Sequence, residues 1–123
     1  MAQRSATYPT RPNTLDFDNV IIVEWTGLLN GDTGEPVRLP AFSDRAVQVA
    51  GTFGVGGNAR ILGSLFDTAI NMVTLTDPQG NALDITTAKI EQVMEMSGWF
   101  QPSITAGDGT TSLTVRLIAK KKG

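Results

Sequence analysis

The sequence predicts an all-β domain, an antiparallel β-sandwich with jelly-roll-like connections and seven to eight strands. Segments rich in β-branched and aromatic residues alternate between apolar and polar positions, as half-buried strands do. Turn sequences built on Gly, Pro, Asn and Asp recur roughly every ten residues, which is typical of sandwiches and jelly rolls. The chain has 123 residues, of which 41% are hydrophobic and 18% charged, so it is long enough for one domain with its own core.

The chain begins with a segment, residues 1–13, that we expect to be an extended arm. Pro9 and Pro12 favour extended backbone around them and cannot continue a helix. The arm has too few large apolar groups to form a core, so it either frays or attaches to a partner. The sandwich domain is expected over 14–119, followed by a basic tail over 120–123.

The strongest strand patterns lie at 18–26, 45–53 and 112–119. In 18–26 both faces are partly apolar, so both can be covered. In 45–53 the alternate residues Val47 and Val49 share one face. In 112–119 the core-facing residues are apolar, and the outward positions are Thr114, Arg116 and Ile118.

Shorter strands are expected at 37–39, 59–65, 70–76, 82–86 and 99–105. Pro102 predicts an edge position for 99–105, because proline has no backbone N–H to donate to a neighbouring strand. The chain has room for at most one short helix, near 87–96. Apolar residues recur there at helical spacing, namely Ile90, Val93 and Met94.

Cysteine and histidine are both absent. Their absence excludes a disulfide framework, a thiolate or imidazole zinc site, a cysteine nucleophile and a Ser-His-Asp triad. The apolar runs are far shorter than the ~20 residues that span a bilayer, and residues 1–10 lack the apolar region of a secretory signal. We therefore expect no membrane partner.

The net charge of −2 is unevenly distributed. All twelve acidic residues lie in 14–115, whereas 1–13 and 116–123 carry only basic charges. An acidic body argues against direct nucleic-acid binding, which needs a positive surface. The lysine run over 120–122 is either a solvated tail or a tail that docks on an acidic partner.

The glycines of 51–57 only superficially resemble a phosphate loop, because no helix is expected to follow them; a hairpin turn is the preferred interpretation. A second loop concentrates oxygen ligands that could hold calcium, although the same residues are ordinary turn formers: Asn30, Asp32, Thr33 and Glu35. The pair Asp77 and Asp84 is a weaker candidate of the same kind. Glu91 and Glu95 would share a helix face, with nothing to distinguish them from a solvated face. We therefore predict no catalytic residues, no metal and no cofactor.

Three aromatic residues, Trp25, Trp99 and Phe100, have two interpretations. They could stack on a sugar, a base or a protein partner. Aromatic residues in alternating strands more often belong to the core.

Four segments resemble a family of small virion proteins of tailed bacteriophages; they lie at 27–34, 44–54, 75–82 and 101–115. Together they extend over most of 27–119, and they consist mainly of turns and flanking strand positions. The chain departs from the family at 65–72, which is more apolar, and at 98–102, where relatives tend to have an Arg-Tyr-Ile-Arg-Pro run.

The resemblance implies a structural role without catalysis. It implies a head decoration or cement protein that binds the major capsid protein, is located on the capsid surface of the virion, and is in the host cytoplasm during assembly. It also implies self-association as a homodimer or homotrimer. The alternatives are a tail, connector or fibre-base component, and a carbohydrate-binding β-sandwich module. Candidate partner-binding residues are Arg4, Tyr8, Arg11, Trp99, Phe100, Lys120 and Lys121.

Overall fold

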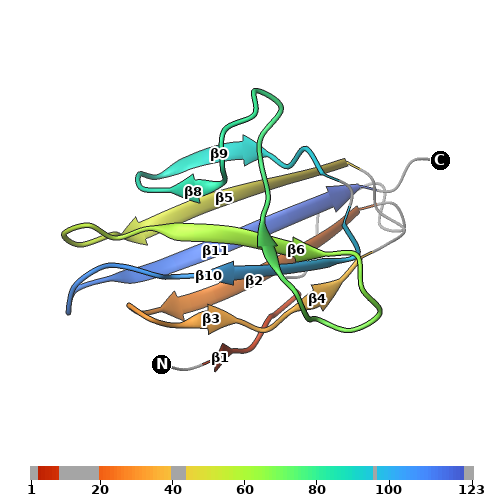
Figure 1. Cartoon of the computed structure of the whole chain (residues 1–123). Coiled ribbons are helices and arrows are strands. Elements are labelled where there is room, and N and C mark those ends of the chain that lie inside the picture. The colour runs from red at the N-terminus through yellow and green to blue at the C-terminus, as the bar shows by residue number, and fades with distance from the viewer. Residues whose placement is uncertain (1–2, 9–19, 40–43, 96, 121–123) are drawn as a thin grey trace.

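The computed structural model describes residues 3–8, 20–39, 44–95 and 97–120, and they form two facing β-sheets (Figure 1). The four-stranded sheet has the order β2 (Val20–Leu28), β11 (Ser112–Lys120), β5 (Asp44–Thr52) and β9 (Lys89–Gln92). The seven-stranded sheet contains β1 (Gln3–Arg4), β3 (Thr33–Gly34), β4 (Val37–Arg38), β10 (Trp99–Ser103), β6 (Ala59–Ser64), β7 (Val73–Thr74) and β8 (Asp84–Ile85). The described residues contain no helix, and the predicted all-β sandwich is confirmed.

The connections wrap the two sheets around each other. β3 and β4 act as one interrupted strand beside β10, and β7 and β8 act as another beside β6. Every connection between the resulting strands from β2 onward, apart from β6 to β7, passes to the other sheet. Neighbouring strands pair antiparallel except β1, which runs parallel to β3. This wrapping is that of a jelly roll.

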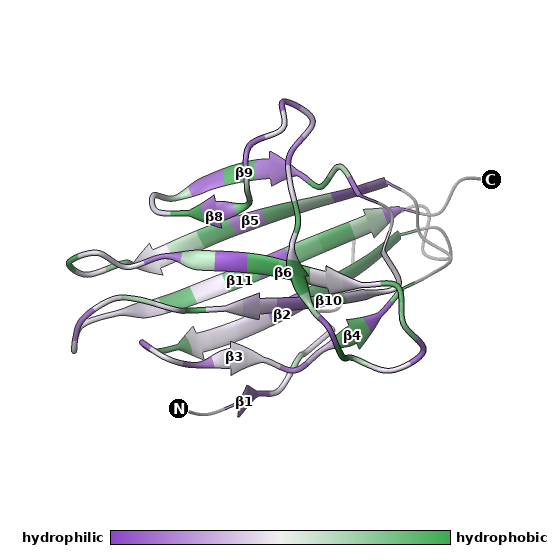
Figure 2. Cartoon of the chain, in the orientation of Figure 1, coloured by the Kyte–Doolittle hydropathy of each residue, from purple (hydrophilic) through white to green (hydrophobic). Residues whose placement is uncertain are grey.

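The core lies between the sheets and follows the alternation of the long strands. In Figure 2 hydrophobic and hydrophilic residues alternate along β5 and β11. Trp25 is the largest fully buried side chain, and its indole N–H donates to the carbonyl oxygen of Glu35 at 3.0 Å. Other core residues from both sheets include Val23, Val47, Val49, Ile61, Ile85, Phe100, Leu113, Val115 and Leu117.

The prediction that 99–105 is an edge strand is wrong. β10 lies inside its sheet, between β6 on one side and β3 and β4 on the other. Pro102 is opposite Ile61, whose N–H and carbonyl bond to Leu83 and Leu75, so the two residues form a non-hydrogen-bonded pair. The nitrogen of Pro102 therefore points toward the break between β3 and β4, where no ladder bond is required.

The segment 87–96, left open as a short helix, contains β9 instead. Its apolar residues do not form one buried stripe, because Val93 is buried while Ile90 and Met94 are each 62% exposed. Pairing with β5 satisfies the β9 backbone, and Val93 continues this pairing by donating to the carbonyl oxygen of Arg45 at 3.0 Å. A helical pattern of only ten residues stabilises a helix less than pairing with the free edge of β5 stabilises a strand.

Two shorter expectations also change. The strand predicted over 70–76 is reduced to β7, and residues 65–72 form a long connection from β6 to β7. In the loop that was expected to hold Asn30 and Glu35, Thr33–Gly34 forms β3, which pairs with Ser103 of β10. Both differences concern segments where local pattern is weak and the pairing partner decides the outcome.

Asp108 ties the β10–β11 turn to the β5–β6 turn. One carboxylate oxygen accepts hydrogen bonds from the backbone N–H and the hydroxyl of Thr110, at 2.9 and 2.6 Å, and the other accepts from the N–H of Val55 at 2.8 Å. These bonds, with that of the Thr110 hydroxyl the largest, lower the pKa of Asp108 to about 2. The ionised carboxylate is thus the form that holds the two turns together.

We expect the stability contributed by Asp108 to disappear in acid. Its folded-state pKa lies below the unfolded value of about 3.9, so the contribution is complete above that value and is lost as the pH falls toward 2. The urea midpoint of the wild type should exceed that of Asp108→Asn at pH 6, and the gap should close as the pH approaches 2. A gap that does not change with pH would contradict the assignment.

Candidate interaction surfaces

The outward side chains of the four-stranded sheet lie in regular rows across the strands. One row, read from β2 to β9, is Ile22, Ile118, Ala46 and Gln92. The adjacent row is Glu24, Arg116, Gln48 and Ile90. We call the four apolar members of these rows the apolar band: Ile22, Ala46, Ile90 and Ile118.

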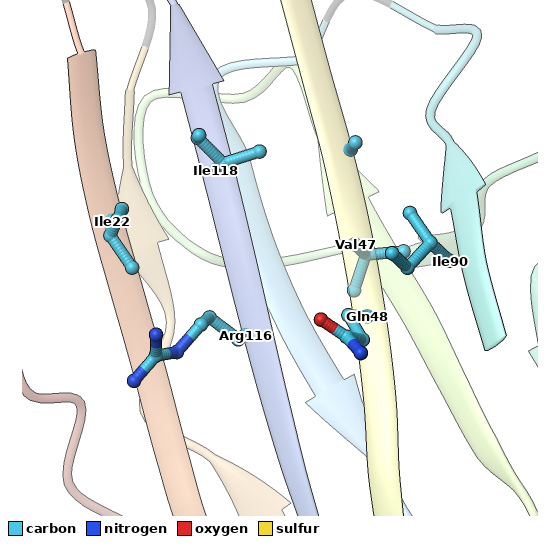
Figure 3. A pocket seen from close by; sticks show the side chains of 7 residues that line it. Ile22, Val47, Gln48, Ile90, Arg116 and Ile118 are labelled. Carbon is cyan, nitrogen blue, oxygen red and sulfur yellow. The ribbon is translucent and has the colours of Figure 1, made fainter. Parts of the chain in front are cut away.

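The apolar band forms a shallow pocket of about 180 Å³ on the outer face of the sheet (Figure 3). Ile118 is 44% and Ile90 62% exposed, and Val47, Gln48 and Arg116 complete the lining. A solvated antiparallel sheet normally alternates hydrophobic-in and polar-out. Isoleucines at outward positions of three strands therefore make this face a candidate contact surface.

A charged pair lies beside the band. Arg116 donates from both Nε and Nη2 to one carboxylate oxygen of Glu24, at 2.9 and 2.5 Å. Both side chains are part-exposed, so the pair contributes little to stability. It gives the apolar band a polar margin, and an apolar centre with a polar rim is the usual anatomy of a protein interface.

A second exposed apolar surface surrounds the β6–β7 connection. Four residues of this connection and of β7 are all more than half exposed, and we call them the loop patch: Leu65, Phe66, Ile70 and Val73. In Figure 2 the start of the connection is coloured as strongly hydrophobic. The loop patch shares no residue with the apolar band and belongs to the other sheet, so the described residues include these two distinct apolar groups.

Specific bonds hold the loop patch in place. The indole N–H of Trp99 donates to the carbonyl oxygen of Phe66 at 3.1 Å, and the Ser64 hydroxyl accepts from the N–H of Phe66 at 3.1 Å. Asn71 has φ of 53°, a left-handed conformation that asparagine tolerates better than most residues. These bonds fix the conformation of the loop, and in that conformation its apolar side chains are exposed.

A pocket of about 320 Å³ lies against the loop patch, with Glu95 and Ser97 in its wall. Glu95 accepts hydrogen bonds from the N–H of Thr76, at 2.7 Å, and from the Thr76 hydroxyl. Burial by itself raises the pKa of Glu95, but the bonds from Thr76 outweigh it and the pKa is lowered. The carboxylate is therefore committed to holding the 76–81 turn.

The described part of the predicted arm contacts its own domain. Arg4 Nε donates to the buried carboxylate of Asp32 at 2.8 Å, and Thr7 exchanges two backbone hydrogen bonds with Glu24. Tyr8 is 57% exposed and remains available to a partner. Arg11 lies outside the described residues.

The other predicted partner-binding residues have different environments. Phe100 is 1% exposed, with the Arg45 guanidinium 4.7 Å from its ring, so this candidate is corrected: it belongs to the core because it is an inward position of β10. Trp99 is half-buried, with Arg38 5.9 Å from its ring. Lys120 is exposed at the end of β11, and Lys121 lies outside the described residues.

The surroundings of the aromatic residues and of the aspartates argue against a sugar platform and a metal site. Trp25 and Phe100 are both buried, so the three aromatic residues form no common platform for a sugar. Asp32 and Asp77 each accept bonds from backbone N–H groups, and the described residues contain no group of three carboxylates suited to a metal ion. Sequence reasoning missed the apolar band and the loop patch, although it placed Ile118 outward and Ile22 on the second face of its strand.

No protein-family model matches the chain, and no curated protein matches it. Within the described ranges, no helix is long and apolar enough to cross a membrane.

Proposed function

We propose that the chain is a structural protein of a tailed-bacteriophage virion, a decoration or cement protein that binds the major capsid protein on the surface of the shell. The observation that carries the proposal is the apolar band on the outer face of the four-stranded sheet. The resemblance of the turn segments to small phage virion proteins supports the same role.

A cement protein must contact at least two neighbouring subunits, and two separate apolar surfaces are suited to that task. The apolar band lies on one sheet, and the loop patch lies on the β6–β7 connection of the other. Dividing the binding between two sites raises the overall affinity through effective concentration. The jelly roll supplies a rigid body between the two contacts.

Decoration is tested with phage capsids assembled without this protein. We expect the purified chain to bind at hundreds of copies per particle, because a shell offers many equivalent sites. Binding at only a few to a few dozen copies would instead assign it to the tail, connector or fibre base. No saturable binding would contradict the virion role.

The apolar band is tested on the same particles with Ile118→Glu. We expect an affinity at least about tenfold lower, because an interface centre loses more than ~1.4 kcal/mol when a charge replaces an apolar anchor. Val55→Glu is the matched control, since Val55 is 82% exposed in the β5–β6 turn and belongs to neither surface. Equal affinities for the two variants would show that the band does not touch the shell.

A further inference from the structure

β9 is the last strand of the four-stranded sheet, and the described part of the chain places no strand beyond it. Val93 donates its N–H toward β5, to Arg45, whereas Met94 donates away from β5, to Thr76. Backbone groups alternate in direction along a strand, so those of Ile90 and Gln92 point away from β5. They form a short open edge of the kind that accepts another strand.

The sequence of this edge complements itself. If two copies of β9 run antiparallel with Ile90 facing Ile90, the two Ile90 residues exchange both backbone hydrogen bonds. In that register Lys89 lies opposite Glu91 of the second copy, and Glu91 opposite Lys89. These are non-hydrogen-bonded pairs, in which cross-strand side chains approach most closely.

Other registers are disfavoured by charge. A shift by two residues in one direction places Lys89 opposite Lys89, and a shift in the other direction places Glu91 opposite Glu91. A lysine on the core-facing side of an edge strand normally prevents strand addition. Here a shift by two residues in either direction brings like charges together, whereas the proposed register places Glu91 opposite the lysine.

The same register also covers apolar surface. On the outer face of the sheet, Ile90 is 62% exposed and would contact Ile90 of the second copy, which covers apolar surface on both.

We propose that two copies of the chain associate through β9 in this register, forming one continuous sheet of eight strands across a two-fold axis. The occupant of the edge is a second copy of the same chain. The apolar bands of the two copies then join end to end at Ile90. The pairing does not depend on the proposed virion role, and it selects the two-fold form over a trimer.

Charge reversal tests the register in solution, by analytical ultracentrifugation over a wide range of protein concentration. We expect Lys89→Glu and Glu91→Lys each to weaken the dimer on the order of tenfold, because two attractive pairs become repulsive. The double variant, and an equimolar mixture of the two single variants, should restore it. Arg60→Glu changes the net charge as Lys89→Glu does but lies on the other sheet, and it should leave the dimer intact. A monomer or a trimer in the wild type, or no restoration in the mixture, would overturn the proposal.

Cross-linking supplies a second measurement, which the absence of native cysteine makes clean. In a hydrogen-bonded pair on the two-fold axis the two Cα atoms are ~5.5 Å apart, a separation that a disulfide can bridge. Ile90→Cys should therefore form a covalent dimer under mild oxidation, and Val55→Cys, at an apolar position that is 82% exposed, should not. Equal yields from the two variants would refute the pairing. Neither experiment involves particles, so its failure is distinct from a failure to decorate capsids.

Discussion

Trp25→Ala is expected to reduce the free energy of unfolding by about 4 kcal/mol, a large part of the ~5–15 kcal/mol that stabilises a typical domain. Trp25 is 1% exposed and reaches across the sandwich from β2. Its ring edge packs so closely on Gly34 that a Cβ added there would lie 2.6 Å from it. Truncation removes this contact between the sheets and leaves a cavity that rigid strands cannot close.

Urea unfolding followed by far-ultraviolet circular dichroism measures the effect without relying on tryptophan emission. Trp25→Phe is the matched variant, because it keeps most of the apolar ring and loses the bond from the indole N–H to Glu35. We expect it to cost about 1–2 kcal/mol. A loss below about 1 kcal/mol for Trp25→Ala would contradict a core in which this ring joins the two sheets.

Gly57→Ala is expected to cost about 3 kcal/mol, at the upper end of the range for overpacking. A Cβ at this position would lie 1.8 Å from the carbonyl oxygen of Phe53, and backbone cannot rotate away as a flexible side chain can. The turn would have to move, and with it the adjacent Asn58. The Asn58 side-chain oxygen accepts bonds from the N–H groups of Thr105 and Ala106, at 3.1 and 3.0 Å, so the disturbance reaches the β10–β11 connection.

Gly109→Ala is the control for this turn effect. Gly109 also lies in a turn between strands, but a Cβ there meets no atom within 4 Å. The thermal midpoint of Gly109→Ala should stay close to that of the wild type while that of Gly57→Ala falls. If both variants unfold at the same temperature, the close approach at Gly57 is not what requires glycine.

The long strands could be predicted from sequence because their alternation is complete. The inward residues of β11 are all apolar, and its predicted outward residues, including Arg116 and Ile118, do face out. β5 could be predicted for the same reason, and β2 because it is dense in β-branched and aromatic residues. The bounds of β5 and β11 in the structure differ by only a residue or two from the predicted bounds.

The elements that were predicted less well depend on partners distant in the chain. β9 forms because it can pair with β5, and no feature of the sequence within 87–96 indicates that pairing. Pro102 is compatible with an inner strand only because β3 and β4 are interrupted beside it, which local pattern cannot reveal. Of the strand predicted over 70–76 only β7 forms, and the apolar residues Leu65, Phe66 and Ile70 before it are exposed in the connection.

The candidate surfaces were partly visible in advance. Ile118 and Ile22 were both placed on outward or second faces, and two such residues on neighbouring strands are the signal of an outer apolar band. Ile90 was missed because it was assigned to the stripe of a helix. Its row position depends on the register with Gln48, which only the paired strands define.

The position of β11 has a consequence for how the chain is made. β11 follows every other strand in the chain, yet it lies inside the four-stranded sheet, between β2 and β5. During translation β2 has no partner strand within its sheet, apart from the two bonds of Glu24 with Thr7, until the residues around 112–120 have left the ribosome. Closing a contact over so long a stretch is slow and leaves strand edges open meanwhile. A chain whose translation stops before β11 therefore lacks an inner strand of this sheet. Only a chain that includes β11 can form the complete apolar band.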